Sequence, residues 1–171
     1  MPSARPSKKT AAATAAPATP SAEPFTESVD TGFLRTLVGY NARRASLAVI
    51  EVFMERMAVY RLKVVDFSVL SLVAHNPGIT SRQLCATLNV LPPNLVGLIA
   101  ALERRGLIER RPHPSDGRAM GVHLTPAGAE LTAQAEQTAA QLEVDATARL
   151  TAAERTTLIR LLQKVYTQSA S

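Results

Sequence analysis

One stretch limits the fold of this chain more than any other: Leu107 to Thr125, with the sequence LIERRPHPSDGRAMGVHLT. Two strand-like runs, Leu107–Arg110 and Met120–Leu124, flank a turn that is rich in proline, serine, aspartate and glycine. This pattern predicts a small antiparallel β-ribbon. Arginine suits the oxygens of phosphate groups, so we expect the ribbon to contact nucleic acid rather than to support catalysis. The arginines around the turn are Arg110, Arg111 and Arg118.

The composition favours a helical protein around this ribbon. The chain has 171 residues, which suits one folded domain with or without an extension. Hydrophobic residues make up 46% of the chain but aromatic residues only 4%, and alanine and leucine supply most of the apolar count, which favours helices over a β-sandwich. The formal net charge is +5, and the arginines of residues 104–118 are opposed there only by Glu109 and Asp116. The positive charge therefore lies on one part of the molecule, where it would attract a polyanion.

Apolar periodicity divides the chain into a tail and several helices. Residues 1–28 form an Ala/Thr/Pro/Ser tract with too little apolar bulk to fold, so we expect a disordered tail. Apolar residues recur at three- and four-residue intervals from Thr31 to about Tyr60, which predicts one long amphipathic helix with a face suited to dimer contact. Further helices are expected at residues 66–74, 80–88, 92–105, 125–148 and from 151 to about 169.

Local signals indicate where the central helices begin and end. Thr80 and Gln83 form a predicted capping box, in which each side chain serves the other residue's free backbone N–H. Asn89 tolerates the left-handed turn that ends this helix, and Gly106 ends the next one. The resulting order is helix, turn, helix and basic two-stranded wing. In such an arrangement the second helix would enter the major groove of DNA by its N-terminal end, with the wing at an adjacent minor groove.

These residues resemble the MarR family of bacterial winged-helix regulators, over about residues 31–168. The most specific part is Leu102 to Gly128, LERRGLIERRPHPSDGRAMGVHLTPAG, which combines the end of the recognition helix, the wing and the next helix at the family's spacing. The resemblance implies a mainly α fold with a small β-wing: a winged helix-turn-helix lobe at 62–124 and dimerisation helices at 31–60 and 125–169. It also implies a homodimer that acts as a transcriptional repressor and binds a pseudo-palindromic operator, with half-sites about one helical turn apart.

The resemblance assigns DNA-binding roles to three groups of residues. In the wing, Asp116 and Arg118 match the family's Asp-x-Arg signature, in which the arginine enters the minor groove and the aspartate steadies the wing tip. The expected wing residues are Arg110, Arg111, Ser115, Asp116, Gly117 and Arg118. The first helix and its start contribute Thr80, Ser81 and Arg82. The recognition helix contributes Pro92, Pro93, Asn94, Val96 and Gly97.

The start of the expected recognition helix departs from the family's pattern. Members usually offer an acidic or hydroxyl cap followed by serine or threonine, and often an arginine where Gly97 stands, whereas this chain has LPPNLVG. Only Asn94 offers a hydrogen-bonding side chain for a base edge, and it suits adenine. Either the site relies on shape and backbone contacts, or its affinity is modest. Two other functions stay open: a sequence-tolerant architectural DNA-binding protein, and a winged-helix protein-interaction module, although such modules tend to lose the wing arginines.

The family also suggests a small-molecule effector. Many members bind small anionic aromatic molecules between the DNA-binding lobe and the dimer helices, so an aromatic carboxylate or a phenol is the expected class, held in part by arginine. The candidate pocket residues are Tyr40, Arg43, Arg44, Phe67 and His75, for which surface charge and packing are the alternative roles. The single cysteine, Cys85, lies in the helix-turn-helix rather than in the first helix, where the redox-sensing members usually carry their reactive cysteine. An inert buried thiol is therefore favoured over a redox switch.

The sequence contains no signal for an enzyme or for a membrane anchor. Its three histidines lack metal-ligand spacing with one another or with Cys85, and it has no glycine-rich phosphate loop, nucleophile elbow or HExxH motif. We therefore expect neither a metal nor a cofactor. A single cysteine fits a reducing compartment, and no apolar run is long enough to span a bilayer. The expected location is the bacterial cytoplasm, on the nucleoid when DNA is bound.

Overall fold

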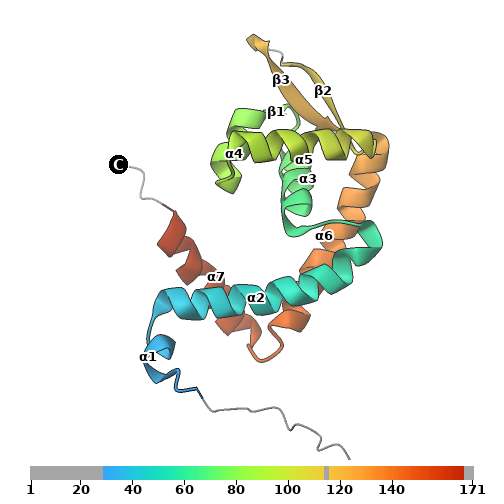
Figure 1. Cartoon of the computed structure of the whole chain (residues 1–171). Coiled ribbons are helices and arrows are strands. Elements are labelled where there is room, and N and C mark those ends of the chain that lie inside the picture. The colour runs from blue at the N-terminus through green and yellow to red at the C-terminus, as the bar shows by residue number, and fades with distance from the viewer. Residues whose placement is uncertain (1–28, 114–115, 168–171) are drawn as a thin grey trace, which may run out of the picture.

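The computed structural model describes residues 29–113 and 116–167, with the side chains of residues 113 and 116–119 left aside. It shows a mainly α-helical protein with one small antiparallel sheet, as the sequence predicts. Figure 1 shows a lobe that contains the sheet and a layer of long helices that crosses beneath it. In chain order the elements are α1 (Gly32–Arg35), α2 (Val38–Met57), a 3-10 turn η1 (Ala58–Tyr60), α3 (Val64–His75), β1 (Ile79–Thr80), α4 (Ser81–Leu88), α5 (Pro92–Arg104), β2 (Ile108–His113), β3 (Asp116–Leu124), α6 (Pro126–Ala146) and α7 (Ala152–Tyr166).

The predicted single helix over residues 31–60 is wrong, because the chain interrupts it near its start. α1 ends at Arg35, Leu37 is extended with φ −91° and ψ 128°, and α2 begins at the next residue. The break is held by Asn41, whose Nδ2 donates hydrogen bonds of 2.8 Å to the carbonyl oxygens of Arg35 and Leu37. Side-chain bonds of this kind compete with the backbone ladder of a helix. Apolar periodicity alone does not reveal such an interruption.

The helix-turn-helix pair forms as its local signals predict. The capping box at the start of α4 is confirmed: the Gln83 N–H donates to Thr80 Oγ1 at 3.3 Å, and the Thr80 N–H donates to Gln83 Oε1 at 2.9 Å. Asn89 adopts the predicted left-handed conformation, with φ 51°, and Pro92 opens α5 at its first position. The directions of α4 and α5 differ by 115°, an angle that is typical of a helix-turn-helix.

The wing strands are longer than predicted. β2 continues to residue 113 and β3 begins at residue 116, whereas the sequence pattern ended the first strand at Arg110 and began the second at Met120. The antiparallel register pairs Arg110 with Val122 and Pro112 with Met120, and it shifts between residues 112 and 113. The ladder therefore includes polar and proline positions that show no apolar alternation. In Figure 1 the two strands project beyond α5 at one end of the lobe.

A third strand, β1, is absent from the sequence prediction. It consists of only Ile79 and Thr80, which pair with Val122 and Gly121 of β3, so the sheet order is β1–β3–β2. Two residues are too few to show an alternating pattern. Gly78, just before β1, lies very close to β3: a Cβ atom on Gly121 would stand 2.7 Å from its carbonyl oxygen. This close approach anchors the base of the wing to the end of α3.

The hydrophobic core joins the lobe to the long helices. Buried side chains come from α2, α3, α4, α5, α6, the sheet and two connecting segments. They are Phe53, Met57, Leu62, Val69, Leu70, Val73, Ile79, Leu84, Leu95, Ile99, Leu102, Leu107, Ile108, Val122, Ala135 and Leu142. Among the described residues no single helix is long and apolar enough to cross a membrane. α4 and α5 reach that length and apolarity only together, with a sharp bend between them.

α6 runs from the wing to the layer of long helices, and α7 follows it (Figure 1). Thr125 caps α6, since the Gly128 N–H donates to Thr125 Oγ1 at 3.0 Å. α7 opens with a capping box in which the backbone N–H and then the hydroxyl of Thr151 lower the pKa of Glu154. No residue of α7 is buried, although one side of this 15-residue helix is apolar. Helices of this length are marginal in isolation. α7 presents an apolar surface that the described part of the chain does not fully cover.

Candidate nucleic-acid interface

α5 buries one side in the lobe and leaves the other side exposed. Leu95, Ile99 and Leu102 are each 1% exposed and hold the helix in place. An α-helix turns about 100° per residue, so Asn94, Val96 and Gly97 lie on the exposed side of the helix, whereas Leu98 still packs against the core. We call the exposed positions near its N-terminus the recognition face: Pro92, Pro93, Asn94, Val96 and Gly97. All five residues predicted to contact DNA from this helix are therefore exposed on the lobe.

The recognition face offers very few polar groups. Pro92 and Pro93 carry no N–H, and the N–H groups of Asn94 and Leu95 both donate to the carbonyl oxygen of Leu91, at 3.0 Å and 3.2 Å. The N-terminus of α5 thus lacks the free N–H groups with which many helices hold a phosphate. The Asn94 side chain makes no hydrogen bond to another described residue. It is therefore the single polar side chain on the recognition face that is ready to bond a base edge.

At the start of α4, one of the predicted DNA-binding residues caps the helix and the other two are exposed. The Thr80 hydroxyl lies 2.8 Å from Gln83 Oε1 and accepts the Gln83 N–H, so it serves the helix cap. Ser81 and Arg82 are exposed on the first turn of the same helix. Of the three residues predicted to approach the DNA backbone here, Thr80 would have to give up its capping bonds to do so. Ser81 and Arg82 need no such change.

Two of the wing arginines form ion pairs within the chain. Arg110 donates to Glu103 of α5 at 2.8 Å, and Arg111 donates to Glu109 on its own strand. The sequence interpretation missed the role of Glu103, because it lies seven residues before its partner. Exposed ion pairs contribute at most about 1 kcal/mol, so DNA phosphates can displace these carboxylates. Ser115 lies outside the described residues, and Asp116, Gly117 and Arg118 are described only as backbone at the start of β3.

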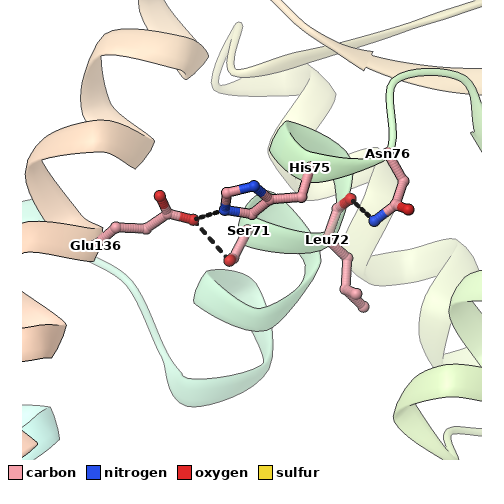
Figure 2. A network of polar contacts seen from close by, with 5 residues as sticks. All are labelled: Ser71, Leu72, His75, Asn76 and Glu136. Carbon is pink, nitrogen blue, oxygen red and sulfur yellow. Dashed lines mark hydrogen bonds and ion pairs between the residues drawn. The ribbon is translucent and has the colours of Figure 1, made fainter.

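A polar network connects the lobe to α6 (Figure 2). Glu136 Oε1 accepts a hydrogen bond from Ser71 Oγ at 2.7 Å and lies 3.0 Å from His75 Nε2. Ser71 and His75 are four residues apart, so they lie on the same side of α3. His75 was a predicted pocket residue, but here its ring pairs with a carboxylate of α6. The i, i+4 spacing of these two polar residues on a mostly apolar helix is the sequence signal for this contact.

The predicted effector pocket is not assembled within one chain. Tyr40, Arg43 and Arg44 lie in the first two turns of α2, whereas Phe67 packs edge-on against Phe53 near the other end of that helix, with ring centroids 5.6 Å apart. The stretch of α2 between Tyr40 and Phe53 spans about 20 Å at the usual helical rise. A groove of about 550 Å³ lies elsewhere, between the end of α3 and α4. It is lined by residues 76–79 with Leu72, Gln83 and Thr87, and by none of the five predicted residues.

Comparison with known proteins identifies the family of this lobe. A family model described as MarR family matches residues 62–119, which span α3, the helix-turn-helix and most of the wing. A candidate transcriptional regulatory protein for the hcr operon of Thauera aromatica is 32% identical over 134 residues, which cover 78% of this chain and 81% of that relative. This chain belongs to the MarR family.

Solved structures of MarR-type proteins match most of this MarR-family chain. The transcriptional repressor CouR bound to a 23-mer DNA duplex is 36% identical with a TM-score of 0.76, over 81% of this chain and 99% of that one. CouR bound to p-coumaroyl-CoA is 33% identical with a TM-score of 0.74, over 82% and 99%. The Mycobacterium tuberculosis MarR family protein Rv2887 in complex with salicylic acid is 26% identical with a TM-score of 0.63, over 75% and 96%. The MarR-family chain is thus a DNA-binding transcriptional regulator and not an enzyme.

Proposed function

We propose that this protein is a homodimeric repressor of a pseudo-palindromic operator, with α5 in the major groove and the β2–β3 wing in the adjacent minor groove of each half-site. The observation that carries the proposal is the recognition face, which is exposed on a helix whose other side is firmly buried. The basic wing lies next in the chain and projects beyond α5 (Figure 1). CouR, which matches this chain over most of its length, is a repressor that binds a DNA duplex.

Exposed apolar side chains on α1, α2 and α7 support the homodimer. A soluble regulator gains nothing from leaving such residues in water, and groups of them are typical of interaction surfaces. A second copy is the partner that a two-fold operator requires. The exposed residues are Phe33, Leu34, Val38, Leu47, Ile50, Met54, Leu158, Ile159, Leu161, Leu162, Val165 and Tyr166.

Substitutions in the recognition face and in the wing should have different effects on DNA binding. Asn94→Ala is expected to relax sequence preference, because it removes the polar side chain that suits an adenine. Arg118→Ala is expected to weaken binding to most sequences and to lower the slope of log affinity against log salt by about 1, because it removes one phosphate-neutralising cation. Fluorescence anisotropy with operator and random duplexes over a salt series measures both effects. Wild-type behaviour of both variants at matched salt would contradict the docking.

Selection of bound DNA from a random library provides the operator and tests the proposed function directly. The expected result is an inverted repeat whose half-sites are about one helical turn apart. Equal affinity for selected and random DNA at every salt concentration would instead identify a sequence-tolerant architectural protein. That second candidate rests on the two prolines and the scarcity of polar groups on the recognition face. Failure to bind any duplex would favour a protein-interaction module.

We also propose that a small aromatic anion releases this protein from DNA, with Tyr40, Arg43 and Arg44 as contributing residues. The salicylic acid complex of Rv2887 and the p-coumaroyl-CoA complex of CouR support this class of ligand. Within one chain, Tyr40 lies near the start of α2, whereas Phe67 packs against Phe53 near its other end. Tyr40, Arg43 and Arg44 would therefore line a pocket that the dimer completes.

A thermal-shift panel tests the effector proposal. A ligand at 100 times its Kd stabilises the folded protein by about 2.7 kcal/mol, which is roughly 5–10 °C for a chain of this size. Aromatic carboxylates and phenols are expected to raise the Tm of the wild type, and acetate at the same concentration is not. The double variant Arg43→Gln with Arg44→Gln should lose the shift. No stabilisation by any aromatic acid at millimolar concentration would contradict this proposal.

A further inference from the structure

Val96 is a large apolar side chain that the fold leaves exposed on the recognition face. It is 61% exposed, although it lies next to Leu95, which is 1% exposed. Valine is β-branched and is not a favoured residue in the first turns of a helix. Neither packing within the lobe nor helix propensity therefore explains a valine at this position. The described residues leave its two methyl groups largely exposed, and the surface of a partner can supply their contacts.

The polar chemistry around Val96 leaves one kind of contact available. Pro92 and Pro93 remove backbone donors from the N-terminus of α5, and the following two N–H groups bond to Leu91. Asn94 stands about 160° away from Val96 around the helix axis, so the two side chains occupy opposite flanks of the recognition face. On the Val96 flank only apolar contact can distinguish one base pair from another. The C5 methyl group of thymine is the apolar group that base edges present in the major groove.

Gly97 gives a second and independent indication that a partner approaches this part of α5. A Cβ atom on Gly97 would meet nothing within 4 Å, so no atom of the described residues requires a glycine there. Its backbone does not have a positive φ either, since the glycines with positive φ are Gly78 and Gly106. Glycine within a helix is unfavourable relative to alanine. A glycine here leaves no side chain beside Val96, and this allows the helix to lie close to the base edges.

We propose that Val96 recognises a thymine in each half-site through contact with its 5-methyl group, and that Gly97 permits the close approach this contact needs. This inference rests on the proposed function, because it requires α5 to enter the major groove. It adds a specificity-determining residue and the chemical feature of the operator that the residue recognises. The operator half-site thus contains a thymine opposite Val96, in addition to the adenine that suits Asn94.

Replacement of thymine by uracil tests the contact, because it removes only the 5-methyl group and leaves base pairing and hydrogen bonding unchanged. In the selected operator, the thymine positions are replaced one at a time, each in both half-sites. Kd for each duplex is measured by fluorescence anisotropy at one salt concentration. Loss of one buried methyl contact is worth about fourfold in affinity, and loss of two about 15-fold. The wild type is expected to show this loss at one symmetric position.

Val96→Ala is expected to bind the thymine operator about as weakly as the wild type binds the uracil operator. Its affinities for the two duplexes should then differ by less than about twofold. Val59→Ala is the matched control, since Val59 is 78% exposed in the turn between α2 and α3, outside the recognition face. This control should keep the full thymine preference. Because Val96 is exposed, its truncation removes no core packing, and the uracil scan of the wild type does not depend on any variant.

Two results would overturn the inference alone, and a third would overturn the proposed function with it. A preferred operator with no uracil-sensitive position would exclude a thymine methyl contact and leave the proposed function intact. A uracil penalty that is the same in Val96→Ala and in the wild type would assign the contact to another residue. Equal affinity for operator and random DNA would overturn the proposed function and this inference together, so failure of the inference alone is distinguishable.

Discussion

Gly128→Ala is expected to destabilise the folded protein by at least about 3 kcal/mol, a large effect for a single methyl group. A Cβ atom at this position would lie 1.8 Å from the carbonyl oxygen of Leu107 and 2.8 Å from its carbonyl carbon. Both are backbone atoms, and the same oxygen accepts the Thr125 N–H at 3.1 Å. The first turn of α6 would therefore have to move away from the base of the wing. For a chain of this size the expected drop in Tm is roughly 6–12 °C by calorimetry.

Gly97→Ala is the matched control for this prediction. It makes the same chemical change within a helix, but its Cβ would meet nothing within 4 Å. Alanine is the better helix former, so this variant should be as stable as the wild type or more stable by up to about 1 kcal/mol. The same variant should bind operator DNA less tightly, because the added methyl group stands on the recognition face. A wild-type Tm for Gly128→Ala would contradict the close contact between α6 and Leu107.

Leu162→Glu should convert the protein to a monomer and weaken operator binding by at least about 100-fold. Leu162 lies on the apolar side of α7 and is 39% exposed within its own chain, so the substitution removes no core packing. A charge at that position would have to be desolvated in a dimer interface, which is costly. Without the dimer, the two half-sites no longer benefit from linkage, which typically contributes about 10² to 10⁴ in avidity. Sedimentation equilibrium measures the first effect and anisotropy the second.

Gln163→Glu places the same charge on the adjacent position, toward the polar side of the same helix. It should leave both the dimer and the affinity for the operator close to those of the wild type. A Leu162→Glu variant that still sediments as a dimer would show that α7 does not contribute to the interface. A monomer that retains full operator affinity would show that DNA binding does not need two linked half-sites.

The helix ends, the turns and the existence of the wing were predictable because each depends on residues close together in the chain. The capping pair of Thr80 and Gln83 spans four positions, and the left-handed turn at Asn89 is set by that residue's own conformational preference. The same holds for Gly106, whose φ of 69° ends α5. The exposure of Asn94 and Val96 also followed from local order, since both flank the apolar Leu95 in a helix. Local signals therefore sufficed to place the predicted DNA-contacting residues of α5 at exposed positions.

Other features were not predictable because they arise from contacts that no local pattern contains. The break before α2 depends on Asn41 bonding backward to Arg35 and Leu37. The strand β1 exists only because it pairs with β3, more than 40 residues later in the chain. Local periodicity describes which side of an element is apolar, but it does not state which partner will cover that side. The sequence pattern therefore predicted more elements correctly than it predicted contacts between them.

The identity of the family and the chemistry of the recognition face follow from the residues of α4, α5 and the wing alone, because capping, turn formation and helical periodicity act over a few residues. Only the tertiary structure shows that His75 contacts Glu136, which is 61 residues away. It likewise shows that Phe67 of α3 packs against Phe53, far along α2 from Tyr40. It also shows that α7 has no buried residue and that no described atom would lie within 4 Å of a Cβ atom on Gly97. Such facts depend on how distant segments pack, and close packing is decided by the whole chain at once.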